Sequence, residues 1–313
     1  METCLVSGGA GFIGSWLCES LLKDFRVICI DDLSSGNEKN ISTLKKDKNF
    51  KFFKHDIIKK LKISGKINYV FHLASRASPM DYQTYPIHTM LTNSFGTYNM
   101  LNLAKEKKAR FLFSSTSEVY GDPVEHPQKE SYWGNVNPIG IRACYDESKR
   151  FSEALTMTFM REFSVNVRIV RIFNTYGPRM KEDDGRVISN FITQALKGKE
   201  ITVYGNGSQT RSFCYISDMV EGITKAMFSD KASGEVINLG NPNEFKILEL
   251  AKLVRKLTNS RSKIIFRDLP EDDPKRRCPN IDKAKRLLNW KPKVSLEKGL
   301  KKTIQYFKNE FNM

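Results

Sequence analysis

Short apolar runs alternate with segments of helical periodicity through the first half of the chain. Apolar residues recur with helical spacing at 12–23, 86–107 and 146–163. Continuous apolar strands separated by helices are typical of a parallel sheet covered on both faces. The pattern therefore predicts a doubly wound, Rossmann-type α/β fold. The predicted strands lie at 3–7, 26–31, 50–54, 68–73, 109–114 and 166–172.

The second half of the chain is richer in loops. Gly and Pro gather in NTYGPRM, YGNGSQTRS and GNPNEFK. We expect a dinucleotide-binding domain over 1–173, rejoined by part of 212–240, and a smaller lobe made mainly by 174–313. Such a lobe would close over a ligand at the carboxyl ends of the strands. Its predicted helices lie near 186–198, 216–229, 246–258 and 295–309.

The charge balance raises the question of a nucleic-acid partner. Lys and Arg number 51 against 35 Asp and Glu, which gives a net charge of +16. The basic residues are dispersed, their short runs contain no interleaved aromatic residues, and no helix-turn-helix or zinc-finger signature is present. We therefore interpret the charge as a solvated lysine-rich surface that favours an anionic substrate, and we expect no nucleic-acid partner.

Cysteine usage and hydropathy indicate the compartment. The six cysteines are far apart without a CxxC pair, and the four histidines lack metal-ligand spacing, so we expect reduced thiols and no bound metal. No apolar run is long enough to span a bilayer. Met1 leads almost directly into a strand pattern without a signal-type segment. The sequence predicts a cytoplasmic protein with no membrane partner.

A glycine-rich turn, GGAGFIG, follows the first predicted strand and opens a helix. Gly8, Gly11 and Gly14 allow a tight turn and a close approach of the backbone to a pyrophosphate at the helix N-terminus. Asp31 ends the second strand, 17 residues after Gly14. A carboxylate there accepts hydrogen bonds from ribose hydroxyls and repels a 2′-phosphate, which favours NAD over NADP. A turn without a ligand is the structural alternative.

Other cofactor contacts are predicted from the strand ends. Asp56 follows the third strand and is placed to reach the adenine, and Leu73, Ala74 and Ser75 end the fourth strand. Strand-end packing without a ligand is the alternative for these positions. The remaining predicted cofactor residues are Phe12, Ile13, Asp32, Ser35, Ile57, Ser114, Tyr145 and Lys149.

Tyr145 and Lys149 are candidates for the chemistry. They lie four residues apart at the start of a predicted helix, so their side chains share one face. An ammonium beside a phenol favours the phenolate, and we expect the Tyr145 pKa to fall and the residue to act as a general base. Thr116 and Glu118 follow the fifth strand and are expected to face the same cleft. A surface location is the alternative for an isolated Tyr and Lys at this spacing.

Taken together, GGAGFIG, STSEVYGDP, YDESK and IFNTYGPRM resemble the motifs of the extended short-chain dehydrogenase/reductases that act on nucleotide sugars. Within that superfamily, the chain is most similar to the UDP-glucuronate decarboxylases (UDP-xylose synthases), from Cys4 to about Phe307. The strings that carry this closer resemblance are HPQKESYWGNVNPIGIRACYDESKR, DGRVISNFITQAL, ITVYGNGSQTRSF, NLGNP and DDPKRRCPNIDKAK.

Particular positions point to the decarboxylase branch. Ser117 and Glu118 stand where dehydratases usually have an Asp-Glu pair and epimerases have small residues. Arg277 matches an arginine that decarboxylases present to the sugar, although a phosphate clamp or a solvated charge is an alternative. Two positions depart from the branch: Arg76 replaces a proline in LASRASP, and Leu91 replaces a lysine in TMLTN. Arg76 offers a cation that can take the place of the missing lysine.

The resemblance implies a lyase that uses NAD internally. Tyr145 would take the proton of the sugar 4-hydroxyl, and loss of carbon dioxide from the resulting 4-keto sugar would need a stabilised enolate. Arg277 would stabilise that enolate, and Glu118 would orient the carboxyl group and help to protonate carbon 5. The family also implies a homodimer through the helices corresponding to 86–107 and 143–163. The predicted nucleotide-sugar contacts are Asn174, Arg186, Val187, Tyr204, Arg211 and Arg277.

Two other readings stay open at this point. The same scaffold supports a nucleotide-sugar 4-epimerase or 4,6-dehydratase, which the product of UDP-glucuronate would distinguish. A non-catalytic protein that binds NAD or nucleic acid is a different class, and it predicts loss of the Tyr145–Lys149 pair. That pair is intact.

Overall fold

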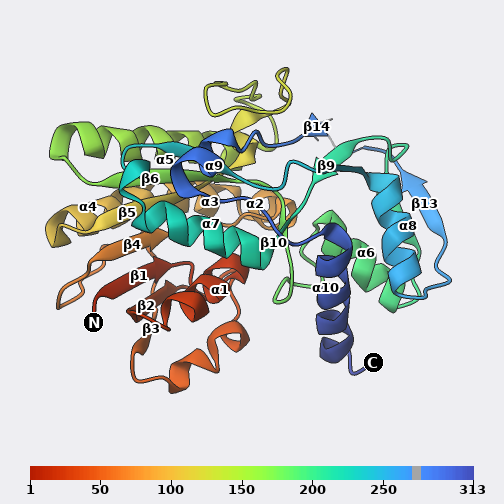
Figure 1. Ribbon diagram of the computed structural model, residues 1–313, viewed down its shortest axis with the longest axis horizontal. Helices are drawn as coiled ribbons and strands as arrows, with labels where there is room; N and C mark the ends of the chain where they lie inside the picture. Colours follow the sequence, from red (N-terminus) through yellow and green to blue (C-terminus); the bar gives the residue numbers. More distant parts are fainter. Residues whose placement is uncertain (270–275) are drawn as a thin grey trace.

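The computed structural model describes residues 1–269 and 276–313, and a seven-stranded parallel sheet forms its centre (Figure 1). Both faces of this sheet are covered, as the near-continuous apolar strands predicted. The doubly wound α/β fold is therefore confirmed. In sheet order the strands are β11 (Val236–Leu239), β6 (Val167–Ile172), β5 (Arg110–Thr116), β4 (Tyr69–His72), β1 (Thr3–Ser7), β2 (Arg26–Asp31) and β3 (Phe50–Lys54).

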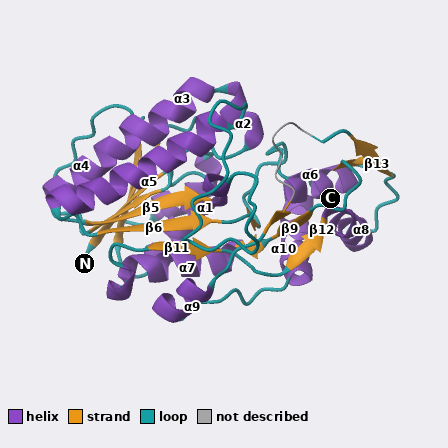
Figure 2. Ribbon diagram, turned by 90° about the horizontal axis from the view of Figure 1, so that it is seen from above, coloured by secondary structure: helices purple, strands orange, loops and turns teal. Residues whose placement is uncertain are grey.

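Alternate residues of each strand enter separate hydrophobic clusters, because successive side chains point to opposite faces. Cys4 and Val6 of β1 pack with residues of α1 (Phe12–Leu21) and α7 (Ile216–Phe228). Leu5 packs on the other face with α4 (Thr97–Lys107) and α5 (Ala143–Phe163). Figure 2 shows α4 and α5 on one side of the sheet and α7 on the other.

The helix predicted over 86–107 is interrupted. α3 (Pro86–Leu91) continues through a π-helical segment, η3 (Thr92–Gly96), into α4. Because π-turns widen the helix locally, the hydrophobic period alone does not reveal them. Two further helices were not predicted: α2 (Pro79–Thr84), capped by the Ser78 hydroxyl, and α9 (Asp282–Leu288). α5 begins at Ala143, three residues before the predicted start.

The smaller lobe is built by α6 (Val187–Leu196), α8 (Ile247–Leu257) and α10 (Leu296–Glu310), which pack on one another. Their apolar faces join the same hydrophobic cluster as α1 and α7, so the two parts share a continuous core. Small sheets complete the lobe: β7 (Thr175–Tyr176) with β10 (Cys214–Tyr215), β8 (Ile201–Tyr204) with β13 (Ile264–Arg267), and β9 (Thr210–Ser212) with β12 (Glu244–Lys246) and β14 (Arg276–Arg277).

The chain crosses between the two parts more than once. After β10 it enters α7, which packs against the large sheet, and β11 then pairs with β6 at that sheet's edge. α8 and α10 belong to the lobe again, at the other end of the molecule (Figure 1). None of the described helices is long and apolar enough to cross a membrane. Of the resemblance string DDPKRRCPNIDKAK, the residues 272–275 lie outside the described part.

Candidate active site

A cavity of about 950 Å³ opens at the carboxyl ends of β1, β2, β4 and β5, between the sheet and the smaller lobe. Every residue that the sequence proposed for the cofactor, the chemistry or the sugar nucleotide lines this cavity. They come from both halves of the chain, from Gly8 to Arg277. The fold thus brings the predicted set together, although the role of each residue is a separate question.

The glycine turn leaves no room for a Cβ atom at Gly8 or Gly14. Gly8 has a φ of +75°, and a Cβ on it would lie 2.7 Å from the Cα of Ala74. A Cβ on Gly14 would lie 2.0 Å from the carbonyl oxygen of Gly8. Gly11 caps α1 without a side-chain hydrogen bond, and the first residues of that helix, Phe12, Ile13 and Gly14, line the cavity. Such an N-terminus is suited to an anion.

Asp31 is fixed at the end of β2. Its carboxylate is buried and accepts hydrogen bonds from the backbone N–H groups of Ala10 at 3.0 Å and Leu33 at 2.8 Å. Burial raises the pKa of Asp31, and these backbone donors oppose the rise. A Cβ on Gly36 would lie 2.7 Å from the carboxylate, so the loop after β2 closes around it.

Tyr145 and Lys149 lie in the first turns of α5, and both are almost completely buried. The ammonium of Lys149 donates to the carbonyl of Ser114 at 2.9 Å, and burial lowers the Lys149 pKa to about 7. Burial raises the pKa of Tyr145, and a hydrogen bond with the Thr116 hydroxyl opposes that rise only in part. The expectation of a lowered Tyr145 pKa is therefore wrong for this structure, because desolvation outweighs both this hydrogen bond and the charge of Arg186.

Glu118 lies between two guanidinium groups. Arg277 and Arg142 both donate to its carboxylate, and Arg277 also donates to the carbonyl of Gly121 at 2.8 Å. Burial disfavours the carboxylate, but the charges of Arg277 and Arg142 outweigh burial and lower the Glu118 pKa to about 2. An ionised Glu118 is a poor proton donor, so its predicted part in protonating carbon 5 does not fit. Its position fits a support for Arg277.

The alternative of a solvated charge at Arg277 is wrong, because only 3% of the side chain is exposed. Its neighbour on β14, Arg276, is exposed. This difference follows from the pairing of β14 with β9, which turns alternate side chains to opposite sides.

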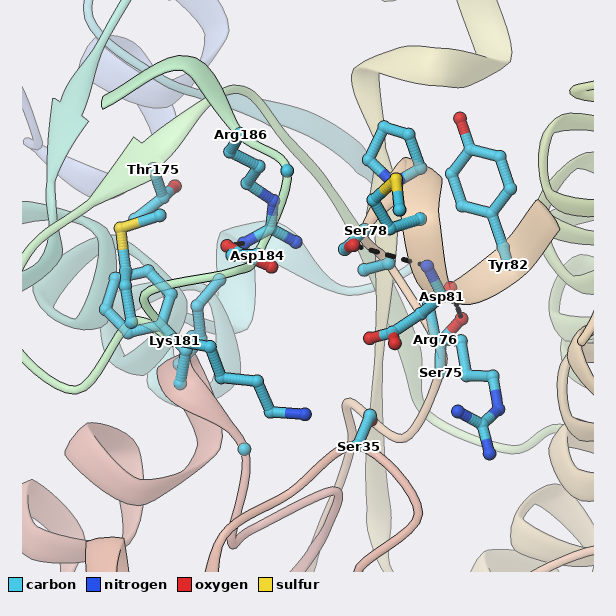
Figure 3. Close-up of a pocket in the computed structure, with 18 of the residues that line it drawn as sticks. Ser35, Ser75, Arg76, Ser78, Asp81, Tyr82, Thr175, Lys181, Asp184 and Arg186 are labelled. Carbon is cyan, nitrogen blue, oxygen red and sulfur yellow. Dashed lines mark hydrogen bonds and ion pairs between the residues drawn. The ribbon is translucent and has the colours of Figure 1, made fainter. Parts of the chain in front are cut away.

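On the lobe side, the cavity wall carries a mixture of charges. Arg186 lies beside Asp184, with 3.2 Å between Nη1 and Oδ2 (Figure 3). Val187 begins α6, Asn174 precedes β7, and Tyr204 at the end of β8 is nearly half exposed. Acidic and basic side chains therefore both line the cavity on this side.

Three residues of this environment were missed in the sequence. Arg142 precedes α5 and pairs with Glu118, and the late predicted start of that helix concealed it. The Tyr82 ring stacks on the Tyr145 ring with 5.0 Å between centroids, but it belongs to the unpredicted α2. Asp146 adjoins Tyr145, and burial together with the nearby Glu118 raises its pKa to about 8.

Comparison with known protein families shows the family to which this chain belongs. A sequence model described as GDP-mannose 4,6 dehydratase matches residues 5–303. The chain belongs to this family. Among its relatives, UDP-glucuronic acid decarboxylase 1 of Danio rerio is 52% identical over 98% of this chain and 72% of that protein. UDP-glucuronic acid decarboxylase 4 of Arabidopsis thaliana is 50% identical over 97% of this chain and 68% of that protein. The resemblance to the UDP-glucuronate decarboxylases is confirmed.

A solved structure of the same architecture is UDP-glucuronic acid 4-epimerase from Bacillus cereus in complex with UDP-glucuronic acid and NAD. It is 30% identical, with a TM-score of 0.88 and coverage of 98% of this chain and 99% of that chain. At that identity the scaffold is shared between the decarboxylase and epimerase branches of the family. The residues around Glu118 therefore matter more than the fold for distinguishing the two.

Arg76 and Leu91, the two residues that depart from the decarboxylase branch, lie differently with respect to the cavity. Arg76 lines the cavity and is 7% exposed. Leu91, at the end of α3, is not among the lining residues. Of the two substituted positions, only Arg76 therefore contributes a side chain to the cavity wall.

The structure also brings together potential metal ligands that are far apart in the sequence. His126, Glu244 and Cys278 form one group, and Asp32, Asp56 and His88 form another, each with ligand atoms within 4.8 Å of one another. In the first group, His126 and Glu244 already form a hydrogen bond of 2.8 Å. No residue spacing pointed to either group, because spacing reveals only ligands that are close along the chain.

Proposed function

We propose that this chain decarboxylates UDP-glucuronate to UDP-xylose through a 4-keto intermediate, as a carboxy-lyase of nucleotide-sugar biosynthesis. The observation that carries the proposal is the ion pair between Arg277 and Glu118 in the same cavity wall as Tyr145. Relatives that are 52% and 50% identical bear the name UDP-glucuronic acid decarboxylase, which supports it.

NAD is the cofactor that the cavity fits. The glycine cradle would reject a side chain at Gly8 or Gly14, and the fixed carboxylate of Asp31 is suited to ribose hydroxyls. A bound NAD would supply reversible hydride transfer at sugar carbon 4, so that the reaction would have no net redox change. Gly8, Gly11, Phe12, Ile13 and Gly14 would hold the pyrophosphate side, and Asp31, Asp32, Ser35, Asp56 and Ile57 the adenosine side. The end of β4 (Leu73, Ala74 and Ser75) and Ser114 would line the nicotinamide side.

Tyr145 serves as the general base for the sugar 4-hydroxyl in this proposal. Its burial keeps bulk water from the phenol, and Thr116 is hydrogen-bonded to it. The Lys149 ammonium lies 5.8 Å from the Tyr145 ring centroid and is oriented by the Ser114 carbonyl. A cation so placed stabilises the phenolate form of Tyr145, which is the form that takes the proton.

Arg277 provides the charge that decarboxylation requires. Carbon dioxide leaves from a β-keto acid, and the electrons of the broken bond form an enolate on the sugar ring. A preorganised guanidinium stabilises that developing charge without reorganisation. Glu118 and the Gly121 carbonyl fix the guanidinium in the cavity wall. The sugar nucleotide itself would be held by residues that all lie after residue 173, namely Asn174, Arg186, Val187, Tyr204 and Arg211.

The product of UDP-glucuronate tests this function. The purified protein with NAD⁺ should release carbon dioxide and form a UDP-pentose, which mass spectrometry of the sugar nucleotides detects. An epimerase would give a product of unchanged mass, and a 4,6-dehydratase acting on a UDP-hexose would give a product lighter by one water. Either product, formed without release of carbon dioxide, would contradict the decarboxylase proposal and favour the corresponding epimerase or dehydratase.

Asp31 should set the preference between the two nicotinamide cofactors. We expect NAD⁺ to bind more tightly than NADP⁺, because a 2′-phosphate beside this carboxylate would be repelled. Asp31→Asn should reduce the difference between the NAD⁺ and NADP⁺ affinities, since it removes the charge and keeps the side-chain shape. Isothermal titration calorimetry measures both affinities, with Asp47→Asn, at an exposed position, as the control. Equal affinities in the unmodified protein would contradict the assignment.

We also propose a homodimer formed through the helices over 86–107 and 143–163. Its support is a set of exposed large apolar side chains on those helices, namely Ile87, Met90, Phe95, Tyr98 and Phe151. Light scattering should give twice the mass of the chain, and Phe95→Asp should shift the protein towards monomer. The cytoplasm is the proposed location.

A further inference from the structure

Arg76 is a buried cation without an acidic partner. Its side chain lines the cavity and the residue is 7% exposed. Within residues 1–269 and 276–313, no carboxylate oxygen lies within 4.0 Å of its guanidinium, and its buried Nε has no hydrogen-bond partner. Nη1 donates to the carbonyl of Ser34 at 3.3 Å. A desolvated guanidinium of this kind is stabilised when an anion completes its surroundings.

The strand order shows where that anion would lie. β1 stands between β4 and β2 in the sheet, and the glycine turn follows β1. Arg76 follows the end of β4, and Ser34 follows the end of β2. A side chain that leaves the β4 end and bonds to the β2 loop therefore spans the edge of the sheet where the glycine turn begins α1. Figure 3 places Arg76 across the pocket from Lys181 and Arg186 of the smaller lobe.

Tyr85 holds the guanidinium from its outer side. The Cζ of Arg76 lies 4.3 Å from the centroid of the Tyr85 ring, and that ring is about half exposed. Stacking on an aromatic face leaves the edge donors of a guanidinium available to another ligand. Arg76 is thus oriented by the stack and by Ser34, while part of its donor set stays unused.

We infer that Arg76 is a clamp for the pyrophosphate of the bound dinucleotide, opposite the N–H groups at the start of α1. This inference rests on the proposed function for the identity of the dinucleotide, NAD. A forked guanidinium binds phosphate oxygens in a bidentate manner, which a single ammonium does not. The clamp suits a reaction in which the same cofactor must stay bound between its reduction and its reoxidation. Arg76 then belongs to the cofactor, and it does not replace the charge missing at position 91 for the sugar.

Binding of NAD⁺ without any sugar nucleotide tests the clamp. Arg76→Gln should weaken NAD⁺ and ADP-ribose by about tenfold or more, the size expected for a lost charge-assisted hydrogen bond. Adenosine, which lacks the pyrophosphate, should bind the variant and the unmodified protein equally in displacement titrations. The dissociation rate of NADH, followed by stopped-flow fluorescence, should rise. Arg161→Gln, at an exposed position on α5, is the matched control and should change none of these values.

Arg76→Lys keeps the proposal testable if the glutamine variant does not fold. It retains the charge and loses the fork, so NAD⁺ affinity should fall to an intermediate value. Unchanged NAD⁺ affinity in both variants would overturn the clamp. So would a loss confined to UDP-glucuronate relative to UDP-glucose, which would assign Arg76 to the sugar carboxylate. Failure of the unmodified protein to bind NAD⁺ would overturn the cofactor as well, whereas missing decarboxylase activity with these binding changes intact would overturn only the proposed reaction.

Discussion

Replacing Tyr145 by phenylalanine is expected to lower turnover by about 10²- to 10⁴-fold, the range for losing general acid–base catalysis. The substitution removes the phenolic oxygen that, as the phenolate, takes the proton of the substrate, and it keeps the ring. The ring matters separately, because it stacks on Tyr82 at 5.0 Å with nearly parallel planes. The fold and the affinity for NAD⁺ should therefore be retained. Coupled measurement of carbon dioxide release and calorimetric titration of NAD⁺ give the two readouts.

Tyr69→Phe is the control for this prediction. Tyr69 lies on β4, and its hydroxyl bonds to Glu2 at 3.0 Å, outside the cavity. Its replacement should leave turnover unchanged. If Tyr145→Phe keeps full activity, another group must accept the proton. If it loses NAD⁺ binding as well, the hydroxyl has a structural part that the stacked ring does not explain.

The sequence predicted which residues around the glycine turn line the cavity, because the signals for them are local. Gly8, Gly11 and Gly14 follow a strand within a few residues, and Asp31 ends the next strand. Parallel strands place their carboxyl ends at one edge, so residues at strand ends converge in space even when they are distant in sequence. For the same reason Thr116 and Glu118, after β5, lie in the cavity as predicted.

The electrostatics could not be predicted in the same way. The Tyr145–Lys149 spacing shows that both side chains share a face of α5, but it does not show how deeply they are buried, and burial decides the direction of the Tyr145 pKa. The pairing of Glu118 with Arg277 joins residues 159 positions apart. The pairing of β14 with β9 and the hydrogen bonds between Cys278 and Gln128 hold Arg277 there, and no local pattern indicates these contacts.

The second large effect is expected at Arg277. Arg277→Ala should reduce carbon dioxide release by about 10²- to 10³-fold, the cost of removing one donor that stabilises a developing oxyanion. Oxidation at carbon 4 requires Tyr145 and Lys149, whereas the enolate appears only in the later step. The loss should therefore fall on decarboxylation, and reduced cofactor should accumulate, as absorbance of NADH shows. Arg276→Ala is the matched control, since Arg276 is the exposed neighbour on the same strand.

The contact between Arg277 and Glu118 determines how related variants should behave. Because Glu118 is held by Arg142 as well as Arg277, its carboxylate keeps a cationic partner in Arg277→Ala, and the variant should fold and bind UDP and NAD⁺. Arg277→Lys keeps the charge but cannot donate to Glu118, Gly121 and the substrate from one planar group, so it should also be impaired. If Glu118 acts by positioning Arg277, Glu118→Gln should slow carbon dioxide release in the unmodified background and add little to Arg277→Ala. Additive losses would mean that Glu118 touches the substrate by itself. Normal carbon dioxide release from Arg277→Ala would show that the guanidinium supports the fold of β14 and has no part in the chemistry.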